Sequence, residues 1–327
     1  MSKEIYHEAR GKSRVSFPAR GLSDPVATGV LARARHAADP KEPAIVHERA
    51  YAKINLGLKV LEGRPDGYHD ILTVLQAVSL CDRLQLTETT GAIEVICTDP
   101  EVPSDERNLV YRAAVALRER LGVGRGARIL LEKGIPTAAG LGGGSSDAAA
   151  ALRGLVRLWH LRRETGALCD LATSLGCDVA FFLTGGTAIA SGRGERLESV
   201  AWPEERFYVV VYPGFGVSTG WAYHLRRTGL TSHSEYVKFI GLLRQRPSLA
   251  LGLYDVLEND LEAAVGARHP QIPQIKAALL QRGARAASMS GSGSSVYGVF
   301  DTQSIAQQAA STLAVGSHRV WVCSSLP

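Results

Sequence analysis

A glycine-rich segment runs directly into an alanine-rich helix former in the stretch Pro136-Thr-Ala-Ala-Gly-Leu-Gly-Gly-Gly-Ser-Ser-Asp-Ala-Ala-Ala-Ala-Leu152. Glycine permits left-handed backbone conformations and close approach to a ligand, so successive N–H groups can converge on one anion. A helix that begins at Ser145 would point its unpaired amides and the positive end of its dipole at that anion. The sequence therefore predicts a phosphate-binding loop.

The spacing excludes two common phosphate loops. A Walker A loop needs Gly-Lys-Ser/Thr at the start of the helix, and no lysine precedes Ser145. The segment from Gly140 to Ser145 also fails the dinucleotide pattern G-x-G-x-x-G. Composition alone would also allow a flexible linker or a tight turn between a strand and a helix. A linker is disfavoured because the strand-like segment Ala127-Arg-Ile-Leu-Leu-Glu-Lys133 precedes the loop and a helix former follows it.

The composition is that of an ordinary folded protein. At 327 residues and 45% hydrophobic, the chain can bury a sizeable core and is expected to form two domains. It has neither an apolar run of about 18 residues nor a signal-peptide pattern, so we expect a cytoplasmic protein without a membrane partner. Its five cysteines are scattered without a C-x-x-C pair, which predicts reduced and mostly buried thiols.

The net charge of +5 does not by itself indicate nucleic acid as a partner. Basic residues are interleaved with acidic ones and do not cluster on one predicted helix or strand. A positive cleft within a mildly basic enzyme serves an anionic small molecule equally well. We therefore expect a small-molecule substrate and no nucleic acid.

Three regions follow from the patterning. Residues 1–44 lack sustained periodicity and are expected to be a poorly ordered extension, whose acidic residues argue against a transit peptide. The next two regions, 45–202 and 203–327, meet at Trp202-Pro-Glu-Glu205. Grouped rather than alternating elements predict an α+β fold in both.

Strands are expected at 51–60, 71–78, 83–87, 93–98, 127–133, 187–191, 196–200 and 207–212, on both sides of the 290–295 turn and at the C-terminus. Helices are expected at 109–121, from 145, at 164–175, 219–227, 234–245, 257–264 and 274–282, and before the last strand.

Two charged residues are candidates for chemistry. The strand 51–60 places Lys53, Asn55 and Gly57 on one face, because side chains alternate along a strand. A lysine there is often a solvated edge residue, and Asp178 could be an N-cap or turn residue. Beside a phosphate loop, however, an aspartate can accept an alcohol proton while a lysine stabilises negative charge and keeps the carboxylate ionised.

Two further loops are open to two interpretations. The loop Gly63-Arg-Pro-Asp-Gly-Tyr-His69 is a turn by composition, either flanking a core strand or presenting Tyr68 for base stacking and His69 for hydrogen bonding. The segment Ser290-Gly-Ser-Gly-Ser-Ser295 is either a hairpin turn or a second loop whose backbone contacts the ligand.

Three ordered motifs together resemble the GHMP kinases, a family that includes galactokinase, homoserine kinase and mevalonate kinase. They are Ala52-Lys-Ile-Asn-Leu56, the glycine-rich loop, and Ser288-Met-Ser-Gly-Ser-Gly-Ser294. The resemblance extends from about residue 50 to the C-terminus. It implies a two-domain GHMP kinase fold: an ATP-binding, catalytic N-terminal domain similar to ribosomal protein S5 domain 2, and a ferredoxin-like C-terminal domain. The ligands would lie between the two.

The resemblance also implies roles for individual residues. Asp178 would be the general base and Lys53 its electrostatic partner in ATP-dependent phosphorylation of an alcohol. Asn108 and Lys133 would lie near the adenine. Mg²⁺ would be required, with its ligands unassigned and Ser145 or Ser146 as candidates. The ATP phosphates would be bound by Pro136, Thr137, Ala138, Ala139, Gly140, Leu141, Gly142, Gly143, Gly144, Ser145 and Ser146.

Within the family, Arg64-Pro-Asp-Gly-Tyr-His69 and Gly176-Cys-Asp-Val179 resemble the members that phosphorylate a cytidine diphosphate derivative. Tyr68 would then stack on cytosine, His69 would hydrogen-bond to it, and Asn55 would line the substrate side. Cys177 stands where a small residue is expected, which should affect packing more than chemistry. We expect a monomer or a homodimer, between which the sequence does not decide.

Two alternatives remain at this stage. One is another small-molecule GHMP kinase of the homoserine or mevalonate type, which would have little use for the Tyr68–His69 pair. The other is a catalytically silent nucleotide-binding member, which would need the glycine loop but neither Lys53 nor Asp178.

Overall fold

The computed structural model describes residues 44–327 except 66, 162–164, 202–204 and 226–257. Apart from residue 44, the predicted extension lies outside the described residues, as does the helix predicted at 234–245. The described residues belong to one compact unit, 42–327.

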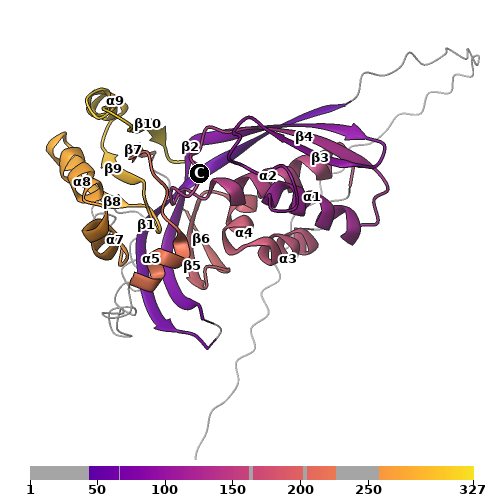
Figure 1. The fold of residues 1–327 in the computed structure, drawn as a ribbon, viewed down its shortest axis with the longest axis horizontal. Helices are drawn as coiled ribbons and strands as arrows, with labels where there is room; N and C mark the ends of the chain where they lie inside the picture. The colour runs from indigo at the N-terminus through magenta and orange to yellow at the C-terminus, as the bar shows by residue number, and fades with distance from the viewer. Residues whose placement is uncertain (1–43, 66, 162–164, 202–204, 226–257) are drawn as a thin grey trace, which may run out of the picture. The chain divides into compact units, whose positions relative to one another are not determined.

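A six-stranded sheet forms the first half (Figure 1). Its order is β3-β4-β2-β5-β6, and β1 pairs with β2 in an antiparallel ladder from Ile45↔Thr87 to Gly63↔His69. The prediction of two separate strands at 71–78 and 83–87 was wrong. Opposite the step from Tyr51 to Ala52, the paired residues of β2 move from Cys81 to Val78, so residues 79 and 80 form a bulge and β2 stays continuous. The strands are β1 Ile45–Gly63, β2 His69–Thr89, β3 Ile93–Cys97, β4 Gly126–Glu132, β5 Thr187–Gly192 and β6 Arg196–Val200.

Four helices lie together on one side of this sheet: α1 Leu109–Arg120, α2 Gly143–Leu158, α3 Thr165–Leu175 and α4 Cys177–Thr184 (Figure 1). The central helix, α2, starts at Gly143 rather than at the predicted Ser145. Its residues Ala148 to Leu152 are all buried, and the small alanines allow close packing against β1 and α1. The helix α4 was not predicted; it follows α3 after the single residue Gly176.

A four-stranded antiparallel sheet of order β10-β7-β9-β8 forms the second half. The predicted helix 257–264 is displaced: α7 begins at Glu262, because Asn259 and Asp260 bond to other parts of the chain, including β1. The strands are β7 Phe207–Tyr212, β8 Ala286–Met289, β9 Val296–Phe300 and β10 Arg319–Ser324. The helices are α5 Thr219–Leu225, α7 Glu262–Arg268, α8 Gln271–Gln281 and α9 Gln303–Ser311.

The two sheets share a core. Apolar residues of β1, such as Ile54 and Leu56, form one buried cluster with Tyr208, Val210 and Tyr297 of the second sheet. The strand β1, which carries Lys53, therefore pairs within the first sheet and also packs against the second. Among the described residues, no helix is long and apolar enough to cross a membrane.

Candidate active site

A cavity of about 960 Å³ is lined by residues from both halves. Its size and its mixture of backbone, charged and aromatic groups suit a small-molecule ligand. Asn108 and Ser146 are not among the residues that line it. The lining includes the predicted site residues Lys53, Asn55, Tyr68, His69, Lys133, Pro136, Thr137, Ala138, Ala139, Gly140, Leu141, Gly142, Gly143, Gly144, Ser145 and Asp178.

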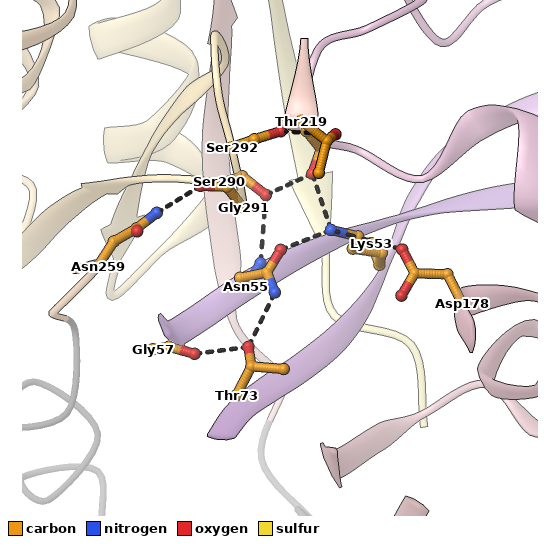
Figure 2. A network of polar contacts seen from close by, with 11 residues as sticks. Lys53, Asn55, Gly57, Thr73, Asp178, Thr219, Asn259, Ser290, Gly291 and Ser292 are labelled. Carbon is orange, nitrogen blue, oxygen red and sulfur yellow. Dashed lines mark hydrogen bonds and ion pairs between the residues drawn. The ribbon is translucent and has the colours of Figure 1, made fainter. Parts of the chain in front are cut away.

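Lys53 lies at the centre of the site (Figure 2). Its ammonium donates hydrogen bonds to Asn55 Oδ1 at 2.5 Å and to the Gly140 carbonyl at 3.0 Å, and its Nζ lies 3.9 Å from Asp178 Oδ2. Burial lowers the pKa of Lys53, while the Asp178 carboxylate opposes that shift. Lys53 is therefore a buried residue of the site and not the solvated edge residue that a strand lysine commonly is.

Asp178 is the second residue of α4, in its first turn, and follows the N-cap residue Gly176 and Cys177. Its side chain is 37% exposed, in contrast to the buried Lys53, and it lines the cavity. A carboxylate that is open to the cavity on one side and faces an ammonium on the other can receive a proton from a bound alcohol. The neighbouring Cys177 also lines the cavity, and burial raises the pKa of its thiol.

The glycine loop leads directly into α2, at the place where an anion site was predicted. Gly140 and Gly142 have φ values of +77° and +71°, in the left-handed region that favours glycine. Gly142 is the N-cap of α2 and offers no side chain to bond the first amides of the helix. Because Gly143 and Ser145 line the cavity, the start of this 16-residue helix adjoins the ligand space.

The third motif loop, residues 288–295, bonds to the other two motifs. Ser290 Oγ donates to the Gly140 carbonyl at 2.9 Å and accepts from the Asn55 amide at 3.2 Å. The Ser295 amide donates to the Ala139 carbonyl at 3.1 Å. The segment is thus more than a hairpin turn, since it connects the strand of Lys53 to the glycine loop.

A buried charge cluster fixes Lys133 beside Gly143. Lys133 Nζ lies 2.5 Å from Asp82 Oδ2 and 2.7 Å from Asp147 Oδ2, and Asp82 Oδ1 also accepts from the amides of Gly134 and Ile135. Asp147 Oδ1 has no hydrogen-bond partner within the described part of the chain. Burial raises the pKa of Asp147 well above its usual range, although Lys133 opposes the shift. Sequence analysis missed both carboxylates, because only the fold brings them to Lys133.

Asp147→Asn is expected to lower the free energy of unfolding at pH 7 by less than the about 3–5 kcal/mol that breaking a fully charged buried pair costs, because burial shifts the pKa of Asp147 toward the neutral form, whose shape the amide keeps. An aspartate with a raised folded pKa loses its stabilising contribution as pH rises from the unfolded pKa of about 3.9 through the folded pKa. Urea unfolding at a series of pH values should therefore show a fall in wild-type stability that the variant lacks. A loss of about 3–5 kcal/mol at pH 7 would instead show that a charged Asp147 is required.

Asn108 caps the helix α1 and does not itself line the cavity. Its Oδ1 accepts from the Val110 amide at 2.9 Å and its Nδ2 donates to the Pro103 carbonyl at 2.6 Å, so the side chain caps α1. The next residue, Leu109, lines the cavity together with Lys133. Here Leu109 lines the cavity, whereas Asn108, which was predicted to lie near the adenine, fixes the start of the helix behind it.

The rings of Tyr68, His69 and Tyr223 also line the cavity, and we call this part its aromatic end. The β1–β2 hairpin presents Tyr68, which is 57% exposed and has the Arg193 guanidinium 4.3 Å from its ring centroid. His69 stacks on Tyr223 of α5 at 5.8 Å between ring centroids. Sequence analysis missed Tyr223; the cluster Trp221-Ala-Tyr-His224 after Gly220 was the available signal.

Comparison with known proteins agrees with this geometry. The chain matches the GHMP kinases N terminal domain at residues 108–186 and the GHMP kinases C terminal domain at 242–316. It is 42% identical over 252 residues, 77% of this chain and 86% of the relative, to proteins named 4-diphosphocytidyl-2-C-methyl-D-erythritol kinase from Bacillus cereus (strain B4264) and Bacillus anthracis (strain CDC 684 / NRRL 3495).

Solved structures give the same result. A crystal structure of 4-(cytidine 5'-diphospho)-2C-methyl-D-erythritol kinase aligns with a TM-score of 0.71 and 37% identity, over 86% of this chain and 99% of that one. Homoserine kinase from Cytophaga hutchinsonii aligns with a TM-score of 0.69 and 21% identity, over 88% and 96% of the two chains, which shows the shared fold alone. The chain therefore belongs to the GHMP kinase family, within its group of 4-diphosphocytidyl-2-C-methyl-D-erythritol kinases.

Proposed function

We propose that the protein transfers the γ-phosphoryl group of ATP to the 2-hydroxyl group of 4-diphosphocytidyl-2-C-methyl-D-erythritol, an alcohol of isoprenoid biosynthesis, and releases ADP. One observation carries the proposal. The Lys53–Asp178 pair lies in a single cavity that has an anion cradle and an aromatic end that suits a nucleobase. The names of the relatives supply the acceptor.

ATP would lie along the glycine loop. Its phosphates would meet the backbone amides at the start of α2, where the helix dipole favours negative charge. Its base would lie toward Leu109 and Lys133. The side-chain oxygens of Ser145 and Asp178 line the cavity and are of the type that Mg²⁺ takes as ligands together with phosphate oxygens. Bound Mg²⁺ would neutralise charge on the phosphates.

Asp178 would accept the proton of the acceptor hydroxyl. The alkoxide oxygen then forms a bond to the γ-phosphorus, the bond from that phosphorus to the β,γ-bridging oxygen breaks, and ADP leaves with the electron pair. Lys53 would stabilise the negative charge that spreads over the transferring group. Because its ammonium is buried and held by Asn55 and Gly140, it needs little reorganisation during the reaction.

The cytosine base of the acceptor would lie at the aromatic end. Tyr68 comes from the first half and Tyr223 from the second, so the base could stack on rings supplied by both. His69 is held against Tyr223 and would hydrogen-bond to the base. A small aliphatic acid such as homoserine or mevalonate would leave this end unfilled.

An ADP-release assay with three acceptors tests the proposal. The value of kcat/KM with 4-diphosphocytidyl-2-C-methyl-D-erythritol should exceed those with homoserine and mevalonate by at least ~100-fold, the discrimination expected from stacking and hydrogen bonds to a base. A preference for either small acid would overturn the assignment of the acceptor. Tight ATP binding without turnover of any acceptor would favour the silent nucleotide-binding alternative.

A further inference from the structure

Asn259 bonds to the backbone on both sides of Ser290. It lies just before α7, and its Nδ2 donates to the carbonyls of Met289 and Gly291, both at 2.7 Å. Its Oδ1 accepts from the Leu261 amide at 2.9 Å. The buried side-chain amide therefore uses both its nitrogen and its oxygen in hydrogen bonds. Both donated bonds go to the third motif loop, beside which Figure 2 shows Asn259.

The loop that Asn259 holds is in contact with the reacting centre. Ser290 Oγ joins the Asn55 amide to the Gly140 carbonyl, and that carbonyl in turn accepts from the Lys53 ammonium. The backbone of Gly291 lies so close that a Cβ built on it would be 3.3 Å from Lys53 Nζ. A shift of this loop would therefore displace the hydrogen-bond partners of Lys53.

The segment around Asn259 is itself anchored to the strand that carries Lys53. The Leu58 amide donates to the Glu258 carbonyl at 2.8 Å, and the Asp260 amide donates to the Leu58 carbonyl at 2.9 Å. Asp260 Oδ2 also accepts from the Val60 amide at 2.9 Å. Asn259 thus connects one end of β1 to the loop that contacts the middle of β1.

We propose that Asn259 is a positioning residue for phosphoryl transfer, whose amide group fixes loop 288–295 and through it the contacts of Lys53 with Gly140 and Asn55. The inference rests on the proposed catalytic role of Lys53. The two bonds that Asn259 donates go to backbone carbonyls, which can only accept. The proposed role of Asn259 therefore requires its amide nitrogen.

The variant Asn259→Asp distinguishes the proposed role in holding loop 288–295 from a role that is limited to the start of α7. The carboxylate can still accept from the Leu261 amide, so the start of α7 keeps its bond. It cannot donate to the two carbonyls and places negative charge against them. Glu258→Gln is the matched control, because it alters the residue on the other side of Asn259, whose side chain is 71% exposed and pairs with Lys59 instead of the loop.

The expected result for Asn259→Asp is a kcat lowered about tenfold or more, with KM for ATP and for the cytidine acceptor within about threefold of wild type. Hydrogen exchange of the Asn55 amide, which donates to Ser290 Oγ, should rise about tenfold. Glu258→Gln should leave kcat and this exchange rate within about twofold of wild type.

Wild-type kcat in Asn259→Asp, or unchanged exchange at Asn55, would overturn the inference. If wild type fails to phosphorylate the acceptor, the proposed function fails, whereas the exchange measurement still decides whether Asn259 holds the loop. If Asn259→Asp does not fold, Asn259→Ser takes its place, because a hydroxyl can bond one carbonyl but cannot bridge both.

Discussion

Asp178→Asn is expected to lower kcat by at least ~100-fold while the dissociation constant for ATP stays nearly unchanged, the pattern of a lost general base. The amide is close to isosteric but cannot take a proton from the acceptor hydroxyl. ATP affinity should persist, because the proposed phosphate contacts come from the glycine loop and the start of α2. ADP release measures the first quantity, and titration with ATP in the absence of acceptor measures the second.

The same variant has a consequence for Lys53. Burial lowers the pKa of Lys53 and the Asp178 carboxylate raises it, so removal of that charge should lower the pKa further. Any residual turnover that depends on the ammonium should then be lost at a lower pH than in wild type. Asp170→Asn is a suitable control, since Asp170 lies on α3 with a side chain that is 76% exposed and its ion pair is with Arg120. Full turnover in Asp178→Asn would refute the proposed role.

Periodicity and loop chemistry predicted much of the site. Side-chain alternation placed Lys53 and Asn55 on one face of a strand, and both line the cavity. The glycine run predicted an anion site at a helix start, and α2 begins within that run. The shared face of Lys53 and Asn55 and the helix start in the glycine run could be predicted because each depends on residues that are neighbours in the sequence.

Contacts between distant segments could not be predicted in this way. Asp82 precedes Lys133 by 51 residues and meets it only because β2 and β4 pair. Asn259 lies 30 residues from Met289, in a segment whose pattern resembled a helix. The continuity of β2 depends on a bulge at its own residues 79 and 80, which has no sequence pattern of its own.

Gly140→Ala should destabilise the protein and inactivate it together. At the φ of +77° observed for Gly140, an alanine costs about 1–2 kcal/mol. Its Cβ would lie 2.0 Å from the Ser290 carbonyl oxygen, a backbone atom that can retreat only if loop 288–295 moves. Overpacking of this kind adds about 1–3 kcal/mol, so we expect the free energy of unfolding to fall by about 3 kcal/mol.

Activity should fall further than stability alone would explain. The Gly140 carbonyl accepts from both Lys53 Nζ and Ser290 Oγ, so the displacement demanded by a methyl group separates the elements that hold the ammonium. We expect folded Gly140→Ala to lose about 100-fold in kcat at a temperature well below its unfolding midpoint.

Gly144→Ala is the matched control for stability, because its Cβ would meet only Leu109 Cδ1 at 3.9 Å and an alanine within a helix gains about 0.5–1 kcal/mol. Chemical unfolding of both variants, with kcat measured on Gly140→Ala, separates the two effects. A Gly140→Ala protein as stable and active as wild type would mean that loop 288–295 yields without cost, and that the close packing of the two loops does not position Lys53.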